Sequence, residues 1–299
     1  MTPHLFCLGY GYSAQALAAM VMSEGWIVSG TSRSAEKRSA MQAAGVRAFQ
    51  FDPTHPIADI ATALATATGV LHSIAPGAEG DIVIDRLGAV IARLPTLRWL
   101  GYLSTTGVYG DTRGHLVDET ATLSPTSERS RRRVQAERRW LAFGAQHGIA
   151  VHVFRLAGIY GPHRSAIDQV RKGDARRIVK PGHLFSRIHV DDIAQVLRAS
   201  IDRPNAGRIY NLCDDEAASQ ADVVEYACAL LGIDPPPPIA FADAEPALSP
   251  MARSFWNDNR RIDNRRIKQE LGVVLRHPHY RSGLATIAAG PPSGIRPLP

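Results

Sequence analysis

Two glycines and a small residue stand at fixed spacing near the start of the chain, and they suit the binding of a phosphate-bearing molecule. The segment Gly9-Tyr10-Gly11-Tyr12-Ser13-Ala14 follows an apolar run typical of a strand and opens a pattern typical of a helix. In this setting Gly9 permits a tight turn, Gly11 lets the backbone approach a pyrophosphate, and Ala14 allows close packing of helix on strand. The N–H groups that begin the helix then face the phosphate charge. The segment therefore predicts a dinucleotide-binding site that includes residues 9–13.

A second group of polar residues stands about 20 residues further on, where such a site contacts the adenosine ribose. The end of the second expected strand reads Gly30-Thr31-Ser32-Arg33-Ser34 and lacks the carboxylate that holds a free 2′-hydroxyl. Arg33, with Ser32 and Thr31, can make charge-assisted hydrogen bonds to a 2′-phosphate instead. This predicts NADP(H) as the preferred cofactor, with NAD(H) still possible. The alternative is that Arg33 is a solvated residue at the entry of a helix.

The elements that must position these residues alternate regularly along the first half of the chain. Short apolar runs alternate with longer amphipathic stretches, which is typical of a parallel sheet with right-handed crossovers. The pattern predicts an α/β fold with a doubly wound parallel (Rossmann) sheet of six strands. The expected strands are residues 4–9, 26–32, 46–52, 69–75, 97–105 and 149–161.

The second half of the chain is less regular and predicts a smaller C-terminal α/β lobe that binds the substrate. We assign residues 1–160 to the dinucleotide-binding domain, with 187–213 re-entering it, and 161–186 with 214–290 to the lobe. A short strand is expected at 208–214 and a final helix at 260–272. The end of the chain, 291–299, is expected to be a flexible tail.

Composition narrows the classes of protein and partner. The 299 residues carry a formal net charge of +6, and the three cysteines lie far apart without a CxxC pair, so we expect neither a disulfide framework nor a metal site. No apolar run reaches the roughly 18 residues of a membrane helix, and the start lacks the features of a signal peptide. We expect a cytoplasmic protein without a membrane or nucleic-acid partner, since no nucleic-acid-binding motif accompanies the positive charge.

Several stretches, in the right order, resemble the extended short-chain dehydrogenase/reductase superfamily of the NAD-dependent epimerase/dehydratase type. They are GYGYSA, FDPT with Asp52, LSTTGVYGD at 103–111, FRLAGIYGPHR at 154–164, and RIHVDDIA at 187–194. The resemblance implies that Asp52 meets the adenine and that the stretch after the fourth strand lines the cofactor. The latter is His72, Ser73, Ile74 and Ala75. It also implies that a stretch after the sixth strand runs beneath the nicotinamide, namely Leu156, Ala157, Gly158 and Ile159. A homodimer of this superfamily would use the helices at 81–94 and 126–146.

The same resemblance shows where this chain departs from the active enzymes, in which a Tyr transfers a proton and a Lys four residues later lowers its pKa. The strand Thr that orients the substrate is present as Thr105, but the Tyr and Lys positions are Arg129 and Arg133. Arginine stays protonated and cannot act as general acid or base, although Arg133 can hold a ribose or phosphate. The candidates for the missing proton donor are Tyr109, Tyr102 and Tyr160, and the alternative role of each is a packed aromatic with a hydrogen-bonded hydroxyl. The chain therefore resembles the atypical branch of the superfamily.

The remaining departures limit the reaction. The Asp-Glu pair of the sugar-nucleotide dehydratases is replaced by Thr106 and Gly107, so we reject a 4,6-dehydratase reaction. A guanidinium pair at Arg129 and Arg133 favours either an anionic small-molecule substrate or contact with the cofactor phosphates. The sequence thus predicts an NADP(H)-binding oxidoreductase or epimerase-like enzyme acting on a small polar substrate. The alternative is a catalytically silent NADP(H)-binding sensor or scaffold protein.

Overall fold

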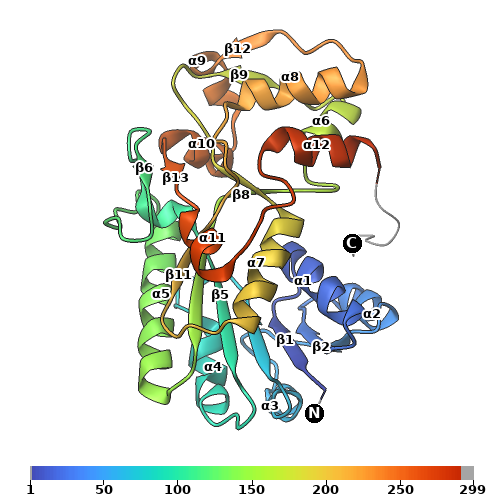
Figure 1. Ribbon diagram of the computed structural model, residues 1–299, viewed down its shortest axis with the longest axis vertical. Coiled ribbons are helices and arrows are strands. Elements are labelled where there is room, and N and C mark those ends of the chain that lie inside the picture. Colours follow the sequence, from blue (N-terminus) through green and yellow to red (C-terminus); the bar gives the residue numbers. More distant parts are fainter. Residues whose placement is uncertain (1, 291–299) are drawn as a thin grey trace.

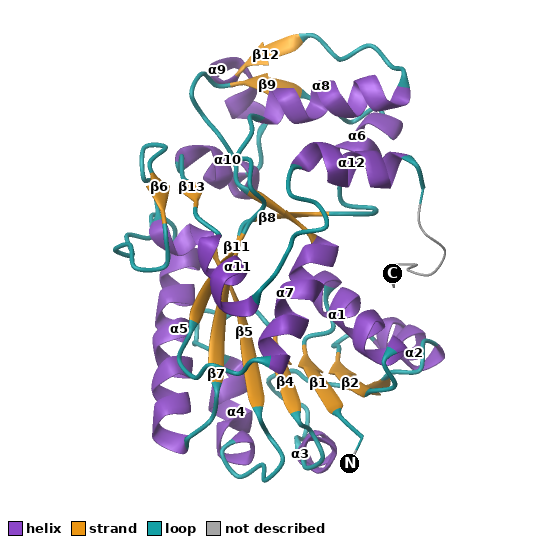
Figure 2. Ribbon diagram, in the orientation of Figure 1, coloured by secondary structure: helices purple, strands orange, loops and turns teal. Residues whose placement is uncertain are grey.

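A seven-stranded parallel sheet forms the centre of the computed structural model, which describes residues 2–290 (Figures 1 and 2). The strand order is β3-β2-β1-β4-β5-β7-β11, and every pairing is parallel. The strands are β1 (His4–Leu8), β2 (Ile27–Thr31), β3 (Arg47–Phe49), β4 (Gly69–His72), β5 (Trp99–Thr105), β7 (Val151–Leu156) and β11 (Ile209–Leu212). The predicted doubly wound α/β fold is confirmed, with one strand more than the six expected, because the short strand predicted at 208–214 extends the sheet beside β7.

Helices cover both faces of this sheet because successive strand residues point to opposite sides. In β1, Leu5 and Cys7 belong to one apolar cluster, whereas Phe6 and Leu8 belong to another. The first cluster contains α1 (Tyr12–Ser23), α7 (Val190–Asp202) and α11 (Arg265–Leu271), and the second contains α3 (Ala58–Leu64), α4 (Ile82–Ile91) and α5 (Glu128–His147). The strand order reverses between β1 and β4, which is where ligands bind in open α/β sheets.

The second half of the chain builds a smaller lobe above the carboxyl edge of the sheet (Figure 1). Three two-stranded pairs contribute to it: β8 (Gly158–Tyr160) with β10 (Arg187–His189), β9 (Arg177–Val179) with β12 (Pro238–Ala240), and β6 (Leu116–Val117) with β13 (Arg261–Ile262). Its helices are α6 (Ala166–Arg171), α8 (Gln220–Leu231), α9 (Phe241–Ala244), α10 (Pro250–Asn257) and α12 (Tyr280–Ala288). The domain boundaries given above stay a prediction, and the predicted tail at 291–299 lies outside the described residues.

The predicted final helix at 260–272 is wrong in two respects. Its first residues form β13, and the helix proper is α11 (Arg265–Leu271), ended by Gly272 in the left-handed region at φ +66°. Helix α12 follows it and closes the lobe against α6 and α8. Among residues 2–290, no helix combines the length and apolar character needed to cross a bilayer.

Helix α5 is the element that carries the two arginines at the expected catalytic positions. Ser127 caps its start by accepting the Ser130 N–H at 3.2 Å, and Gly148 ends it at φ +67°. Val134, Trp140 and Phe143 point into the protein, while the outer face carries Arg131, Arg138 and Arg139. Residues 129 and 133 are one turn apart and therefore share a face of this helix.

Candidate functional site

The turn between β1 and α1 is held from both neighbouring strands. The Gly9 N–H donates to Thr31 Oγ1 at 2.8 Å, the Tyr10 N–H donates to the Thr31 carbonyl at 3.0 Å, and Ser73 Oγ donates to the Gly9 carbonyl at 2.6 Å. Gly9 has φ +88°, and a Cβ there would lie 2.8 Å from Ser73 Oγ and 2.9 Å from an Ile74 carbon. Only glycine fits this position.

The N-terminus of α1 opens directly from this turn and has the properties of an anion site. Gly11 is the N-cap residue, no side chain caps the helix, and its first turn contains no acidic residue. A Cβ on Gly11 would meet no atom within 4 Å, so the space beside it is open. Free N–H groups and the helix dipole together attract a phosphate. The residues present therefore fit the pyrophosphate of a dinucleotide.

A cleft of about 480 Å³, here called the central cleft, runs from this helix start toward α5 and the β7–β8 segment. Two smaller cavities of about 180 and 70 Å³ adjoin it and reach α10. Thr105 and Phe255 line all three. The central cleft collects these predicted site residues: Gly11, Tyr12, Ser13, Ser73, Thr105, Arg129, Arg133, Leu156, Ala157, Gly158 and Ile159.

The two arginines of α5 that line the central cleft differ in the contacts of their guanidinium groups. Arg133 Nη1 donates to the Tyr102 hydroxyl at 3.0 Å and to the Leu103 carbonyl at 2.7 Å, so its position is fixed by neutral acceptors. Arg129 forms no ion pair with any described residue, and its guanidinium lies 5.7 Å from the centre of the Phe255 ring. Partial burial and the charge of Arg133 lower the pKa of Arg129 from its usual value. Arg129 thus adds a second positive charge to the cleft, without an ion-pair partner among the described residues.

Thr105 stands at the junction of the three cavities with its hydroxyl proton free. Its Oγ1 accepts the Gly107 N–H at 3.1 Å, which caps the short helix η1 (Thr106–Tyr109). No hydrogen bond donated by Thr105 occurs within the described part of the chain. The hydroxyl can therefore donate to a substrate oxygen in the cleft.

Tyr109 is the predicted site residue that the structure removes from the cleft. It is 2% exposed, its hydroxyl donates to Asn211 Oδ1 at 2.7 Å and accepts from Arg155 Nη1 at 2.9 Å, and it lines none of the three cavities. Burial raises the pKa of this hydroxyl to about 12, against the opposing effect of Arg155. Tyr109 is a packed, hydrogen-bonded aromatic, and its prediction as a proton donor is wrong because η1 turns its side chain into the core.

The buried partners of Tyr109 form a polar network beneath the carboxyl ends of β5 and β7. Glu137 accepts from Arg155 Nη2 at 2.8 Å and from Ser104 Oγ at 2.5 Å, and both partners of the ion pair are almost fully buried. Asn211 extends the network to β11. The network fixes the ends of three adjacent strands below the cleft.

Several predicted cofactor contacts lie outside the central cleft. Thr31 is 2% exposed, and its hydroxyl oxygen accepts the Gly9 N–H, so Thr31 holds the turn and does not face the cleft. The Tyr10 ring packs against Gly30. Ile74 borders Gly9, and Ala75 is exposed beyond it. Ser32 and Arg33 directly follow β2, and the Arg33 side chain is exposed.

Asp52 and His72 are engaged by protein groups. The Asp52 carboxylate accepts from the Gln50 side chain, the Thr54 N–H and hydroxyl and the His55 N–H, and these bonds lower its pKa. His72 is wholly buried on the α4–α5 side, where its Nε2 bonds Asp81 at 2.8 Å. The expectation that His72 lines the cofactor is wrong. Its side chain lies on the face of the sheet that α4 and α5 cover, whereas α1 and its N-terminus lie on the other face.

The cavity residues that the sequence analysis did not single out include two arginines, an aspartate and a phenylalanine, namely Arg164, Arg260, Asp258 and Phe255. Asp258 accepts from Thr126 Oγ1 at 2.9 Å and from Arg260 Nη1 at 2.7 Å. It is the only carboxylate among the described residues that line the three cavities. Arg164 lies within the quoted stretch 154–164, whereas nothing in the sequence pointed to Asp258 or Phe255.

One group of potential metal ligands lies outside these cavities. His189, Asp191 and His277 bring ring nitrogens and a carboxylate within 4.8 Å of one another. His189 Nδ1 already accepts the Asp191 N–H at 3.2 Å as the N-cap of α7. We propose no metal site there.

Comparisons with known proteins agree with this geometry. A sequence profile of the NAD dependent epimerase/dehydratase family matches residues 9–213. Protein YeeZ of Escherichia coli (strain K12) is 25% identical over 283 residues, which cover 91% of this chain and 95% of YeeZ.

Solved structures extend the comparison. A functionally unknown conserved protein from Silicibacter pomeroyi DSS is 47% identical, with a TM-score of 0.86 and coverage of 96% of this chain and 99% of that one. A dTDP-glucose 4,6-dehydratase from Bacillus anthracis in complex with NAD shares the fold at 16% identity, with a TM-score of 0.78 and coverage of 97% and 96%. The profile match, which spans most of the chain and begins at the glycine turn, shows that this protein belongs to the NAD dependent epimerase/dehydratase family.

Proposed function

We propose that the chain binds NADP(H) in the central cleft and transfers hydride to or from a small anionic substrate. The observation that carries the cofactor is the uncapped start of α1 beside the open space at Gly11. The pyrophosphate would lie on this helix start, and the nicotinamide would lie along Leu156 to Ile159. When bound, the cofactor supplies or accepts the hydride. NAD in the related dehydratase structure supports a dinucleotide in this fold but does not distinguish NADP(H) from NAD(H).

The preference for NADP(H) rests on the end of β2. Arg38, on α2 (Ala35–Ala43), donates from Nη1 to the carbonyls of Ser32 at 3.1 Å and Arg33 at 2.9 Å. Neither Arg33 nor Arg38 forms an ion pair with a described residue. Two guanidinium groups and the Ser32 hydroxyl would thus be available to a 2′-phosphate. Arg38 is a contact that the sequence analysis did not identify.

We expect Arg33→Ala and Arg38→Ala each to weaken NADPH binding by about 10- to 100-fold, because a charge-assisted hydrogen bond contributes about 1.5–3 kcal/mol. NADH binding should change by less than about threefold, since NADH has no 2′-phosphate to contact. Calorimetric titration of both cofactors measures this, with Arg93→Ala, an exposed residue beyond α4, as the control. Equal affinity of the wild-type chain for NADH and NADPH would contradict the preference.

The residues of α5 and β5 would act on the substrate by position and charge. The Thr105 hydroxyl would donate to the substrate oxygen, and Arg129 would hold a substrate carboxylate. Arg129 cannot supply a proton. Tyr12 is no substitute, because burial raises the pKa of its hydroxyl, which donates to the Pro162 carbonyl. Proton exchange would therefore involve water, and dehydration of a sugar nucleotide is not proposed because Thr106 and Gly107 replace the carboxylates it needs.

We expect NADPH oxidation with 2-oxo acids to exceed that with their methyl esters, because only the acids carry a charge for Arg129. Arg129→Gln should lower kcat/KM for the acids by about 100-fold, the equivalent of 2.7 kcal/mol, and leave the esters nearly unchanged. Arg131→Gln is the matched control, since Arg131 is exposed on the same helix and pairs with Glu128 at 2.9 Å. Equal use of acids and esters by wild type and Arg129→Gln would refute the role of Arg129.

A catalytically silent NADP(H)-binding sensor or scaffold is the second candidate. It is favoured by the absence of a free general acid or base among the described residues of the three cavities, where Asp258 is tied to Arg260 and Thr126. Tight NADPH binding without turnover of any carbonyl or imine substrate would support this candidate. Gain of activity in Arg129→Tyr with Arg133→Lys would then show that the cleft is otherwise intact. A homodimer through α4 and α5 stays a prediction.

A further inference from the structure

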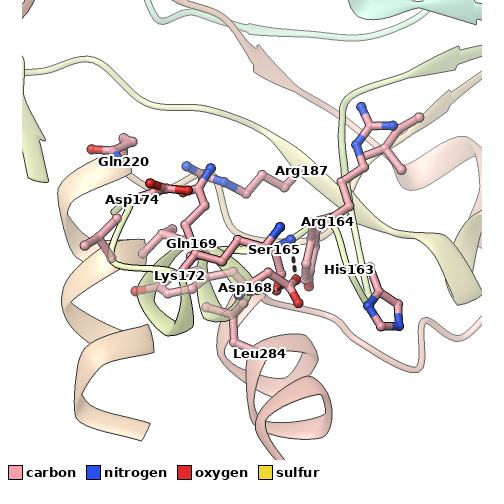
Figure 3. Close-up of a pocket in the computed structure, with 16 residues that line it drawn as sticks. His163, Arg164, Ser165, Asp168, Gln169, Lys172, Asp174, Arg187, Gln220 and Leu284 are labelled. Carbon is pink, nitrogen blue, oxygen red and sulfur yellow. Dashed lines mark hydrogen bonds between the residues drawn. The ribbon is translucent and has the colours of Figure 1, made fainter. Parts of the chain in front are cut away.

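A second cavity, of about 560 Å³, lies in the C-terminal lobe between α6, α8 and α12 and against β8 and β10 (Figure 3). We call it the lobe cavity. It shares only Ile159 and Arg164 with the central cleft and no residue with the two smaller cavities. Its size falls within the range of roughly 300–1,000 Å³ that is typical of small-molecule sites. The proposed cofactor and substrate leave this space unexplained.

One wall of the lobe cavity is apolar and rigid. Val223 and Val224 come from α8 and Leu284 from α12, and all three belong to the buried core of the lobe. Tyr280 adds an aromatic ring beside them. These side chains would pack against the apolar body of a ligand.

The remaining lining includes two cationic side chains without ion pairs. Lys172 is exposed and Arg187 is only partly exposed, and neither forms an ion pair within residues 2–290 (Figure 3). Arg164 also lines the cavity, but its guanidinium lies 5.9 Å from the centre of the Tyr12 ring, which belongs to the central cleft. Arg187 Nη1 donates to the carbonyls of Phe185 and Ala218, both at 2.9 Å, and these acceptors carry no charge. The positive charge of Arg187 therefore has no salt-bridge partner.

Two nearby carboxyl groups do not compensate this charge. Asp214 is 4% exposed, neither of its oxygens has a hydrogen-bond partner, and burial raises its pKa to about 8 against the effect of Arg187. Asp168 lines the cavity but caps α6, accepting the Ser165 N–H at 2.9 Å and the Ser165 hydroxyl at 2.5 Å. Asp174 is the remaining carboxylate of the lining. The lining thus holds the cations Lys172 and Arg187 and the carboxylates Asp168 and Asp174, of which Asp168 is already engaged by Ser165.

We propose that the lobe cavity is a second ligand site, which binds a small molecule that carries an oxyanion on an apolar body. The oxyanion, a phosphate or a carboxylate, pairs with Lys172 and Arg187, and the apolar body rests on Val223, Val224 and Leu284. Arg187 is partly withdrawn from water without an ion-pair partner, which is costly, and a bound anion offsets that cost. The proposal does not depend on whether the central cleft holds NADP(H).

Methyl NMR of the full chain tests the site with phenyl phosphate, benzoate and benzyl alcohol as probes. Phenyl phosphate or benzoate should shift the methyl signals of Val223, Val224 and Leu284, with a Kd in the millimolar range expected for so few atoms. Which of the two binds more tightly identifies the oxyanion. Benzyl alcohol, which lacks the charge, should bind at least about tenfold more weakly.

Lys172→Glu should weaken binding of the preferred anion by at least about tenfold, because it replaces one of the two positive charges by a negative one. Lys37→Glu is the matched control, since it makes the same change at an exposed position of α2 and should leave the Kd unchanged. Equal melting temperatures of the two variants exclude a folding defect. Absence of these methyl shifts, equal binding of benzyl alcohol, undiminished binding to Lys172→Glu, or shifts confined to Leu103 and Leu156 of the central cleft would each overturn the proposal.

Discussion

Replacing Glu137 by alanine is expected to lower the free energy of unfolding by about 3–5 kcal/mol, because it leaves a buried guanidinium without its counter-charge. Glu137 and Arg155 are each 2% exposed, and the carboxylate accepts from Nε at 3.2 Å and from Nη2 at 2.8 Å. The Ser104 hydroxyl loses its acceptor at the same time. Chain relaxation or entry of water can offset only part of this loss.

Urea unfolding at neutral pH measures the effect, and α5 offers its own control. Glu128 forms exposed ion pairs with Arg131 and Arg132 on the same helix, so Glu128→Ala should leave the urea midpoint nearly unchanged. Glu137→Gln keeps the volume and one hydrogen-bond acceptor and should fall between the two. If Glu137→Ala were no more destabilising than Glu128→Ala, the buried network would not stabilise the fold.

This network also explains why the site was harder to predict than the fold. The spacing from Thr105 to Tyr109 left the direction of the Tyr109 side chain undetermined, because the direction depends on η1 and on Arg155 and Asn211 more than 40 positions away. Arg129 and Arg133, by contrast, share a helix face by local geometry alone, and both reach the central cleft. Local periodicity therefore predicts which face a residue occupies only inside a regular element.

The carboxyl edge of the sheet illustrates the same distinction. The glycine turn and the alternation of apolar runs are local patterns, and they predicted the doubly wound sheet and the start of α1. Asp258 and Phe255 reach the cavities through contacts between distant segments, such as the hydrogen bond between Thr126 and Asp258 and that from Arg260 to the Gly110 carbonyl. No spacing rule connects residues 132 positions apart. His72 could have been assigned correctly, because strand alternation places it opposite Leu71.

Gly11→Val is expected to abolish NADPH binding while leaving the fold intact. An added Cβ at Gly11 meets no atom within 4 Å, and the backbone at φ −90° suits any residue, so the free energy of unfolding should fall by no more than about 1 kcal/mol. The valine side chain would instead occupy the open space at the start of α1, where the pyrophosphate must approach the backbone N–H groups. We expect at least about a 100-fold loss of affinity, the equivalent of 2.7 kcal/mol.

Gly9→Ala should instead destabilise the fold itself, because the backbone and the neighbours of Gly9 leave no room for a side chain. Its φ of +88° and the contacts of an added Cβ with Ser73 and Ile74 predict a destabilisation of about 1–3 kcal/mol even without cofactor. Ala19→Val, on an exposed position of α1 away from the turn, controls for a valine in this helix. Thermal unfolding without cofactor and calorimetric titration with NADPH separate the two effects. If Gly11→Val bound NADPH with wild-type affinity, the dinucleotide would lie elsewhere. If it lost binding with an unchanged melting temperature, the N-terminus of α1 would be the pyrophosphate site, because only the bound phosphate needs that space.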